Sequence, residues 1–498
     1  MTNYLYKHLI QPNIDNKKTF LLLDDGTEIS YEDFISLASK ISHKLSNLGL
    51  KLGDRILVKS SKCKETLSLY LSSILTGSVF FPLNPSYTLN ETIYFIEDSK
   101  PSILICESSE VKSIKPICDK IGCKILSLNA NGEGEVTDGL EDLDSLFEPN
   151  NRAKDDLAAL LYTSGTTGKP KGAMLTHQNL VSNAHQLINL WNIDTNDTLI
   201  HALPIYHTHG LFVAINTFMM SGASIRFIKS FNIDLVIEAF KYSTLMMGVP
   251  TFYTRLIKDK RLDESLTKNM KLFISGSAPL LTEVHQDFYN ITGHRILERY
   301  GMTETNMNTS NPFDGERKGG SVGKPLKDIS IRINKTNGDK DTEFNKIGMI
   351  EIKGPNVFKG YLNNPEKTQE SFTKDGYFIT GDIGYFDKDG YLFISGRNKD
   401  LIISGGFNVY PKEIEDVINQ HKSVIESAVF GIKDNDLGEV PIAAVVMIND
   451  KTEIKDLSVY VENNLVKYKI PKNYVVLNEL PKNIMGKVQK NILKDKYS

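Results

Sequence analysis

The sequence predicts an α/β protein in which a large N-terminal domain of several subdomains is joined by a hinge to a small, mobile α+β C-terminal domain. Three observations support this fold class. The chain has 498 residues, short apolar runs alternate with helical periodicity, and the final segment has a pattern of its own. One hydrophobic core seldom organises a chain of this length, so at least two domains are expected.

The alternation is clearest around a loop rich in glycine and threonine. Residues 156–161 form an apolar run typical of a strand, and this run leads directly into the loop. Thr176 is a suitable helix cap, and the apolar residues after it recur at helical spacing. These residues are Leu180, Val181, Ala184, Leu187 and Ile188. Such alternation favours mixed α/β layers over a helical bundle or a β-sandwich.

A second strand marks the domain boundary. Residues 391–397 read as a strand that ends near Gly396, and Pro411 then opens a helix with Ile414 and Ile418 on one face. We therefore predict a large domain at residues 1–396 and a small domain at 397–498, with a hinge at Lys399. A short hinge of this kind permits rotation of one domain against the other.

Composition excludes several classes of protein. The 58 basic residues nearly balance the 61 acidic ones, so no net field attracts nucleic acid or anionic lipid. The apolar fraction of 40% is that of an ordinary globular enzyme. The first residues lack the features of a signal or transit peptide, and no apolar run reaches the roughly 20 residues of a membrane span. We expect a soluble cytoplasmic protein that binds neither nucleic acid nor membrane.

Residues 162–172 combine hydroxyls, glycines and two lysines, a composition suited to phosphate oxygens. Glycines let backbone N–H groups approach an anion, hydroxyls donate hydrogen bonds, and lysine supplies charge. The loop is not a Walker A motif, because two residues separate its glycines and Pro170 follows Lys169. Taken alone, the segment also fits a flexible surface turn.

With further motifs in order, the chain resembles the adenylate-forming superfamily of acyl-CoA synthetases, luciferases and peptide-synthetase adenylation domains. The resemblance spans nearly the whole chain and implies two steps, in which ATP adenylates a carboxylic acid and coenzyme A then takes the acyl group. The matching segments are residues 276–279, 300–305, 380–382, 396–400, 404–411 and 481–487.

The resemblance also assigns residues to ATP. Thr303 contacts the α-phosphate, Asp382 accepts hydrogen bonds from both ribose hydroxyls, Arg397 steadies ribose or phosphate, and Glu304 binds Mg²⁺. The β- and γ-phosphates are held by Thr163, Ser164, Gly165, Thr166, Thr167, Gly168, Lys169 and Lys171. The adenine side is lined by Gly276, Ser277, Ala278, Pro279, Glu298, Arg299, Tyr300, Gly301 and Met302.

The small domain is expected to serve both half-reactions. Lys487 stabilises charge between the acyl oxygen and the α-phosphate, and rotation about Lys399 then brings a second segment toward the CoA tunnel. The CoA-facing residues are Ser404, Gly405, Gly406 and Phe407. Related lysines in the superfamily are acetylated, which suggests a lysine acetyltransferase as a partner acting on Lys487 and removing its charge.

The acid pocket is unusually polar for this superfamily. Arg255 could hold a second carboxylate as a bidentate fork, with Ser277 and His207 assisting, whereas Thr208 and Met302 would limit the space at the central carbon. The segments 204–211, 248–255 and 298–312 resemble those of malonyl-CoA synthetases, which implies malonate and leaves methylmalonate open. Alternatively, Arg255 makes a structural salt bridge.

Three other functions remain open at this stage. The chain could be a ligase for another short, aryl or medium-chain acid, an amino-acid adenylating module that feeds a carrier protein, or a nucleotide-binding protein without activity. The presence of Glu304 and Lys487 argues against the last, and the lack of a carrier domain in this sequence argues against the second.

Overall fold

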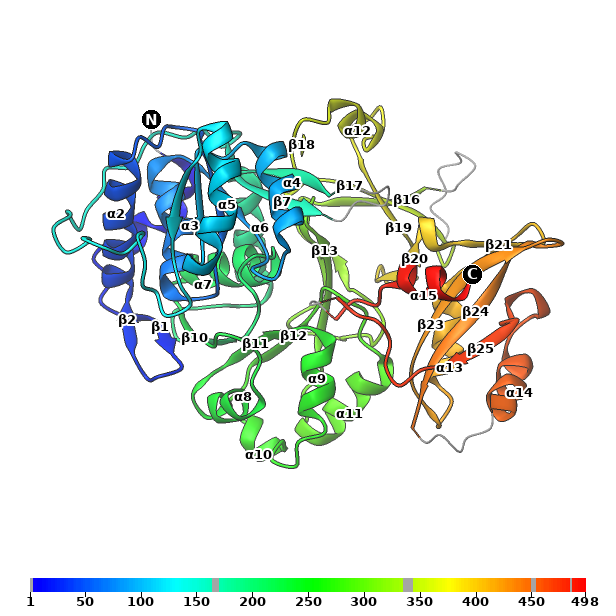
Figure 1. Ribbon diagram of the computed structural model, residues 1–498. Helices are drawn as coiled ribbons and strands as arrows, with labels where there is room; N and C mark the ends of the chain where they lie inside the picture. The colour runs from blue at the N-terminus through cyan, green and yellow to red at the C-terminus, as the bar shows by residue number, and fades with distance from the viewer. Residues whose placement is uncertain (1–2, 164–169, 335–343, 449–453, 484–485) are drawn as a thin grey trace.

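A computed structural model describes residues 3–163, 170–334, 344–448, 454–483 and 486–498 of the chain, arranged as a large and a small domain (Figure 1). The small domain, coloured orange to red, lies beside the carboxyl-terminal part of the large one. The predicted α/β class is confirmed. None of the helices in the described ranges is both long and apolar enough to cross a bilayer.

The first large sheet has the strand order β15-β14-β13-β12-β11-β9-β10-β1-β2. Strands β9 to β13 run parallel, so their carboxyl ends lie along one edge. The strands are β1 (Thr19–Leu23), β2 (Glu28–Ser30), β9 (Thr198–His201), β10 (Ser224–Phe227), β11 (Leu245–Gly248), β12 (Leu272–Ser275), β13 (Leu297–Met302), β14 (Asn306–Ser310) and β15 (Lys324–Pro325).

A second large sheet has the order β18-β8-β7-β4-β3-β5-β6, and a smaller one has the order β16-β17-β19-β20. The strands of the second sheet are β3 (Arg55–Lys59), β4 (Val79–Pro82), β5 (Ile103–Cys106), β6 (Lys124–Ser127), β7 (Leu157–Thr163), β8 (Lys171–Thr176) and β18 (Gly360–Tyr361). Those of the smaller sheet are β16 (Ser330–Asn334), β17 (Gly348–Lys353), β19 (Phe378–Phe386) and β20 (Leu392–Arg397).

Helices cover these sheets. The helix expected after Thr176 is confirmed, with the Thr176 side chain capping the amide of Asn179. The helical segments of the large domain are α1 (Tyr4–Leu9), η1 (Gln11–Asn13), α2 (Tyr31–Asn47), α3 (Lys64–Thr76), α4 (Leu89–Ser99), α5 (Ser108–Ile121), α6 (His177–Leu190), η2 (His209–Ile215), α7 (Asn216–Ser221), α8 (Ile233–Ala239), η3 (Phe240–Tyr242), α9 (Pro250–Leu256), α10 (Glu264–Thr267), α11 (Thr282–Thr292) and α12 (Pro365–Glu370).

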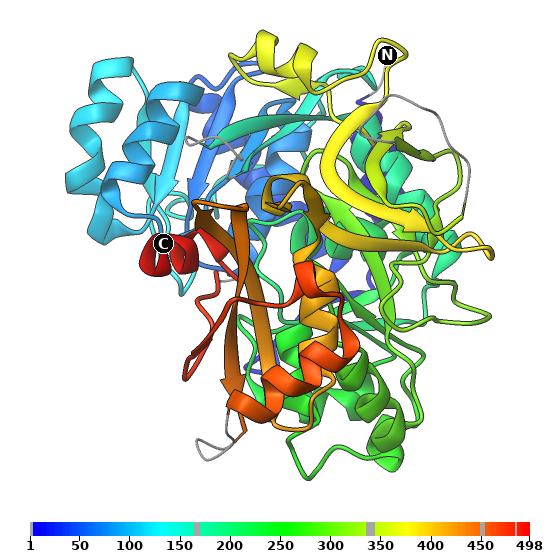
Figure 2. The same ribbon diagram turned by 90° about the vertical axis from the view of Figure 1, so that its right-hand side faces the viewer.

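The small domain is built on a sheet with the order β22-β21-β24-β23, and β25 also pairs with β24 (Figures 1 and 2). Its helix α13 begins at Pro411, as the sequence predicts. The elements are η4 (Asn398–Asp400), β21 (Ile402–Ser404), β22 (Phe407–Val409), α13 (Pro411–Asn419), β23 (Val424–Asp434), β24 (Gly438–Met447), α14 (Ile454–Asn464), η5 (Lys467–Lys469), β25 (Asn473–Val476) and α15 (Lys490–Tyr497).

One continuous core joins the two large sheets. Buried side chains from both sheets pack with helices that lie between them, for example Val58, Leu71, Leu187 and Leu199. The four cysteines, Cys63, Cys106, Cys118 and Cys123, are buried as free thiols. The small domain has separate apolar clusters, which is consistent with a unit that can move as a body.

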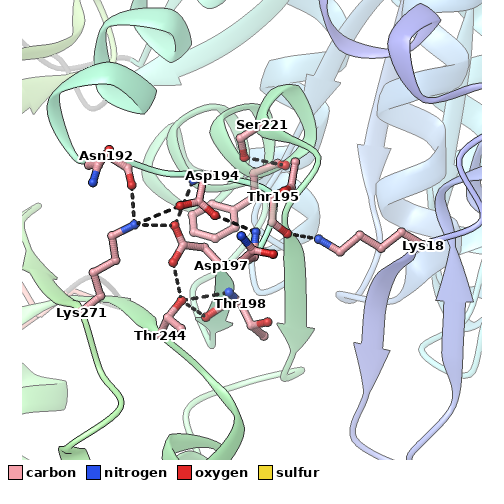
Figure 3. A network of polar contacts seen from close by, with 11 residues as sticks. Lys18, Asn192, Asp194, Thr195, Asp197, Thr198, Ser221, Thr244 and Lys271 are labelled. Atoms are coloured by element: carbon pink, nitrogen blue, oxygen red, sulfur yellow. Dashed lines mark hydrogen bonds and ion pairs between the residues drawn. The ribbon is translucent and has the colours of Figure 1, made fainter.

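A polar network fixes the amino ends of β9, β11 and β12 (Figure 3). Asp197 is 4% exposed, and its carboxylate accepts hydrogen bonds from Lys271 Nζ at 2.8 Å and Thr244 Oγ1 at 2.8 Å. Thr244 in turn accepts a hydrogen bond from the amide of Thr198 at 3.0 Å. The network therefore sets how these strands begin, while their opposite ends remain available for a site.

We expect Asp197→Ala to lower the free energy of unfolding by roughly 3 kcal/mol, because it leaves Lys271 partly buried without its main partner. The thermal midpoint is the measurement. Asp194→Ala is the matched control, since Asp194 lies 3.8 Å from the same ammonium with a side chain that is 55% exposed. Equal midpoints for the two variants would contradict the role given to Asp197.

Candidate active site

The segment predicted to hold phosphates lies between β7 and β8. Thr163 ends β7 and its hydroxyl donates to Glu304 Oε1 at 3.3 Å. Lys171 begins β8, with its ammonium 5.8 Å from the centre of the Tyr361 ring. The rest of the predicted phosphate loop, residues 164–169, lies outside the described residues.

Glu304 is a buried carboxylate, 6% exposed, at the end of the turn after β13. Besides Thr163, its carboxylate accepts a hydrogen bond from the Tyr361 hydroxyl at 3.0 Å. Burial raises the pKa of Glu304, and these hydrogen bonds offset that rise only in part. The nearby positive charge of Arg397 also favours the ionised form, and a buried carboxylate of this kind is the oxygen ligand that a hard cation prefers.

Asp382, Arg397 and Tyr300 form one connected group. Asp382 is 4% exposed, and its Oδ1 lies 2.7 Å from Arg397 Nε, while its Oδ2 accepts a hydrogen bond from the Tyr300 hydroxyl at 2.5 Å. The carboxylate in turn raises the pKa of Arg397, so the guanidinium keeps its charge. Strands β19 and β20 pair Asp382 with Arg397 directly. The fold therefore brings Asp382 and Arg397 together beside Tyr300.

Lys487 belongs to the small domain and lies near the group formed by Asp382 and Arg397. Its loop is closed by a hydrogen bond from the Lys487 amide to Asn483 Oδ1 at 3.0 Å. Gly486 has a φ of +75°, and a Cβ there would lie 3.0 Å from Thr251 of α9 in the large domain. Gly486 thus lies directly against α9 of the large domain.

The side chain of Lys487 is exposed to solvent, but nearby protein groups still change its pKa. Its pKa is lowered, first because protein atoms displace water and then because Arg397 is a like charge nearby. Asp382 opposes that shift. Lys487 of the small domain thus lies within electrostatic reach of Arg397 and Asp382, although it follows them by about 90 residues or more in the sequence.

The turn after β12 approaches β13 closely. A Cβ on Gly276 would lie 2.3 Å from Arg299 Cζ, so any side chain there would displace the Arg299 guanidinium from its present position. Ser277 has a left-handed backbone with a φ of +72°, unusual for a residue with a side chain, and its hydroxyl lies 3.3 Å from His209 Nδ1. Gly276 and Ser277 therefore bring the chain directly over the Arg299 guanidinium.

Glu298 lies next to this turn but contacts other groups. It accepts a hydrogen bond from the amide of Gly320 at 3.1 Å and lies 3.6 Å from His285. Ala278 and Pro279 continue from Ser277, and Gly301 has no room for a Cβ because the carbonyl oxygen of Asn306 would be 2.0 Å away. The predicted adenine-lining residues thus cluster in space, although Glu298 is engaged within the fold.

Arg299 is buried, at 4% exposure, and forms no ion pair with any residue that the structure describes. Its Nε and Nη2 atoms are enclosed, and no described group accepts a hydrogen bond from either. Burial lowers the pKa of Arg299 to about 9, so it remains charged at neutral pH. His209 is also buried, and no described group forms a hydrogen bond with its Nε2. Burial first, and then the positive charge of Arg299, keeps the pKa of His209 well below its usual range.

The other predicted acid-site residues differ in position. His207 lies half-buried with a pKa lowered by burial to about 4, and Thr208 donates to Asn306 Oδ1 at 2.7 Å. Met302 lies at the end of β13, where its sulfur is 3.9 Å from the Tyr300 hydroxyl. Thr303 follows it, half-buried.

Arg255 is exposed on α9, with its guanidinium 5.7 Å from the ring centre of Phe231. It has no ion pair with any described residue, so the alternative of a structural salt bridge finds no support. It lies one helical turn from Thr251, the residue that meets Gly486. Arg255 is thus at the surface, whereas Arg299 is enclosed.

The predicted CoA-facing segment forms the turn between β21 and β22. Gly405 and Gly406 have φ values of +56° and +82°, which suit a tight hairpin. Ser404 precedes them, and Phe407 is 55% exposed and stacks on Tyr468. Lys399 lies in η4, between the domains. The hairpin lies at the outer end of the small domain (Figure 1), away from the loop of Lys487.

Sequence reasoning missed three residues. Tyr361 donates a hydrogen bond to Glu304, and His209 is hydrogen-bonded to Ser277. His201 accepts a hydrogen bond from the Lys62 ammonium. His209 could have been found, because it lies two residues from His207 in a segment already singled out. Tyr361 and His201 carry no local signal and are brought to the site only by the fold.

The chain belongs to the AMP-binding enzyme family: the model of that family matches residues 11–362, and the model of the AMP-binding enzyme C-terminal domain matches residues 413–487. A malonate–CoA ligase from Arabidopsis thaliana is 34% identical over 94% of this chain and 85% of its own length. The resemblance to adenylate-forming enzymes is therefore confirmed.

Solved structures agree with this assignment. The crystal structure of ATP-bound MatB from Rhodopseudomonas palustris is 46% identical, covers 100% of this chain and 99% of its own, and superimposes with a TM-score of 0.97. The apo structure of the same protein, with the same identity and coverage, gives 0.87. The arrangement described above is thus closer to the ATP-bound form.

Glu304 gives a pH prediction. Because its folded pKa is raised above 4.5, the folded protein holds a proton that the unfolded chain has already lost. The free energy of unfolding should therefore fall as pH rises from about 4.5 to the raised pKa of the folded protein, by up to about 1.4 kcal/mol per pH unit. Glu304→Gln keeps an acceptor for Tyr361 and should lack this fall. Thermal midpoints of both ligand-free proteins measure it, and parallel pH profiles would contradict it.

Proposed function

We propose that this chain is a malonate–CoA ligase, which forms malonyl-CoA, AMP and pyrophosphate from malonate, ATP and CoA through malonyl-adenylate. The observation that carries the choice of acid is the buried guanidinium of Arg299, which lacks any counter-ion among the described residues. The malonate–CoA ligase among the relatives supports the same acid.

The energetics of Arg299 favour an acid with two carboxylates. A buried, unpaired cation is destabilising by several kcal/mol, and a bound carboxylate that accepts a bidentate hydrogen bond reverses this. One carboxylate of malonate must react at the α-phosphate, so only the second is free to meet Arg299. A monocarboxylic acid would leave the guanidinium unpaired, and its apolar tail would face a charge.

His209 and Ser277 would complete the recognition of the distal carboxylate. His209 Nε2 is a buried ring nitrogen without a partner, and Ser277 contacts the other ring nitrogen. Met302 and Thr208 would border the central carbon and decide whether methylmalonate also fits. Arg255 remains a candidate for guiding the dianion at the surface, where its charge is exposed.

Adenylation joins two anions, and the remaining residues reduce their repulsion. Asp382 would orient the ribose hydroxyls, Arg397 and Thr303 would contact the phosphates, and Lys487 would stabilise charge that grows as the anhydride forms. Mg²⁺, which neutralises pyrophosphate when bound, would be held by Glu304. These roles rest on the convergence of the side chains and on the family.

Thioester formation needs a second arrangement. Rotation at Lys399 would withdraw Lys487 and bring the hairpin of Gly405 and Gly406 to the acyl-adenylate, and the two TM-scores of MatB support two arrangements. Solvent access to Lys487 would also let an acetyltransferase reach it and remove the charge. Because this rotation needs a hinge at Lys399, we also propose that the boundary between the two domains lies between residues 396 and 397.

The test of the acid compares AMP formation with malonate, methylmalonate, succinate, acetate, octanoate and 4-coumarate. We expect malonate to be preferred, and Arg299→Met to lower kcat/KM for malonate by roughly 10²–10³-fold while activity on acetate is kept. Because methionine removes an unpaired buried charge, the variant should not lose thermal stability.

Arg255→Ala is the matched control, since it deletes an exposed arginine near the same region. If Arg255→Ala loses activity on malonate and Arg299→Met keeps it, Arg255 and not Arg299 binds the distal carboxylate. Preference of the unaltered protein for a monocarboxylic acid would keep the ligase and overturn malonate.

Lys487→Ala tests the first half-reaction alone. With ATP and malonate but no CoA, we expect pyrophosphate release to slow by roughly 10²–10³-fold, because growing negative charge loses its cation. Lys496→Ala removes an exposed lysine from the same domain and should behave as the unaltered protein. An equal rate for Lys487→Ala would assign the adenylation charge to another group.

A further inference from the structure

Lys62 occupies an unusual position between β3 and α3. Its three ammonium N–H groups are shared among four acceptors, which are His201 Nδ1 and the carbonyl oxygens of His201 at 3.0 Å, Leu203 at 3.0 Å and Ile228 at 2.7 Å. It also lies 2.8 Å from His201 Nδ1 and 4.4 Å from the Phe227 ring centre. A single side chain thus joins the carboxyl ends of β9 and β10.

The contacts of His201 define its tautomer. Its Nε2 lies 2.7 Å from the carbonyl oxygen of Gly210, which can only accept, so Nε2 carries the proton. Burial and the nearby Lys62 lower the pKa of His201 to about 3, so the ring is neutral and Nδ1 accepts from Lys62. The direction of the hydrogen bonds is therefore Lys62 to His201 to Gly210.

This chain of hydrogen bonds ends at the start of η2, the π-helix that begins with His209. Gly210 packs directly against the carbonyl of Pro204, where a Cβ would be 2.1 Å from the oxygen, so no side chain fits at this position. His209 in turn lies 3.3 Å from Ser277. The position of His209 beside Arg299 thus depends on how Gly210 is held.

We propose that Lys62 and His201 are positioning residues for the acid site, acting through the Gly210 carbonyl on the placement of His209 and Ser277. The proposal rests on the proposed function only in taking malonate as the acid. Neither residue touches the nucleotide-binding group of Asp382, Arg397 and Glu304 through any contact among the described residues. Substitution of either residue should therefore weaken binding of the acid without changing the binding of ATP.

The experiment measures KM for malonate and for ATP in Lys62→Met. We expect the malonate KM to rise on the order of tenfold or more, because small misplacements of binding groups weaken substrate positioning strongly. The KM for ATP should stay unchanged. His201→Gln, whose amide can still donate to Gly210 but loses the Lys62 contact, should show a smaller rise than His201→Leu.

Lys59→Met separates positioning from loss of stability. Lys59 lies three residues before Lys62, is 1% exposed and pairs with Glu110, so its loss should lower the thermal midpoint without changing either KM. If Lys62→Met lowers only the midpoint, as Lys59→Met does, or raises both KM values equally, the positioning role is wrong.

The test of the positioning role of Lys62 can be separated from the test of malonate as the preferred acid. The acid panel on the unaltered protein identifies the preferred acid, and the variants are then compared with that acid. A different preferred acid overturns the proposed function, whereas a selective rise in its KM would still support Lys62 as a positioning residue.

Discussion

The buried guanidinium of Arg299 is the constraint on which the acid site depends. A cation enclosed by protein without a counter-ion is destabilising, and the described fold supplies none. The surrounding chain is nevertheless built closely around it: a side chain at Gly276 would displace the guanidinium, and Ser277 takes a left-handed backbone. Such an arrangement is understandable if the missing partner arrives with the substrate.

The parallel strands explain why the site lies where it does. Strands β9, β11, β12 and β13 end at one edge of the sheet, and His201, Gly248, Ser275 and the end of β13 face that edge. This is the usual position of ligand sites in open α/β sheets. The network of Asp197 holds the opposite ends, so the strands are fixed where no chemistry occurs. The small domain then closes the edge with the loop of Lys487.

Much of the fold and of the nucleotide site could be predicted from the sequence. The strand before the phosphate loop, the helix capped by Thr176 and the helix opened by Pro411 depend on local patterns, and all three are present. Asp382, Arg397 and Glu304 lie in motifs whose order the family fixes. The structure brings these residues together with Lys487, although their separate roles stay predictions.

The acid site was less predictable, because burial decides which of several cations matters. The sequence assigns Arg255 to the acid and Arg299 to the adenine side, but α9 turns Arg255 to solvent whereas β13 directs the enclosed Arg299 beneath Gly276. Lys62 and His201 lie 139 residues apart and meet only in the folded protein. No periodicity or motif indicates such a contact.

The most direct test of this account is a crystal structure of the protein with bound malonyl-adenylate or a stable analogue. The account predicts that the distal carboxylate lies within hydrogen-bond distance of Arg299 Nε or Nη2, with His209 beside it. A distal carboxylate held by Arg255 at the surface, with Arg299 still unpaired, would contradict it.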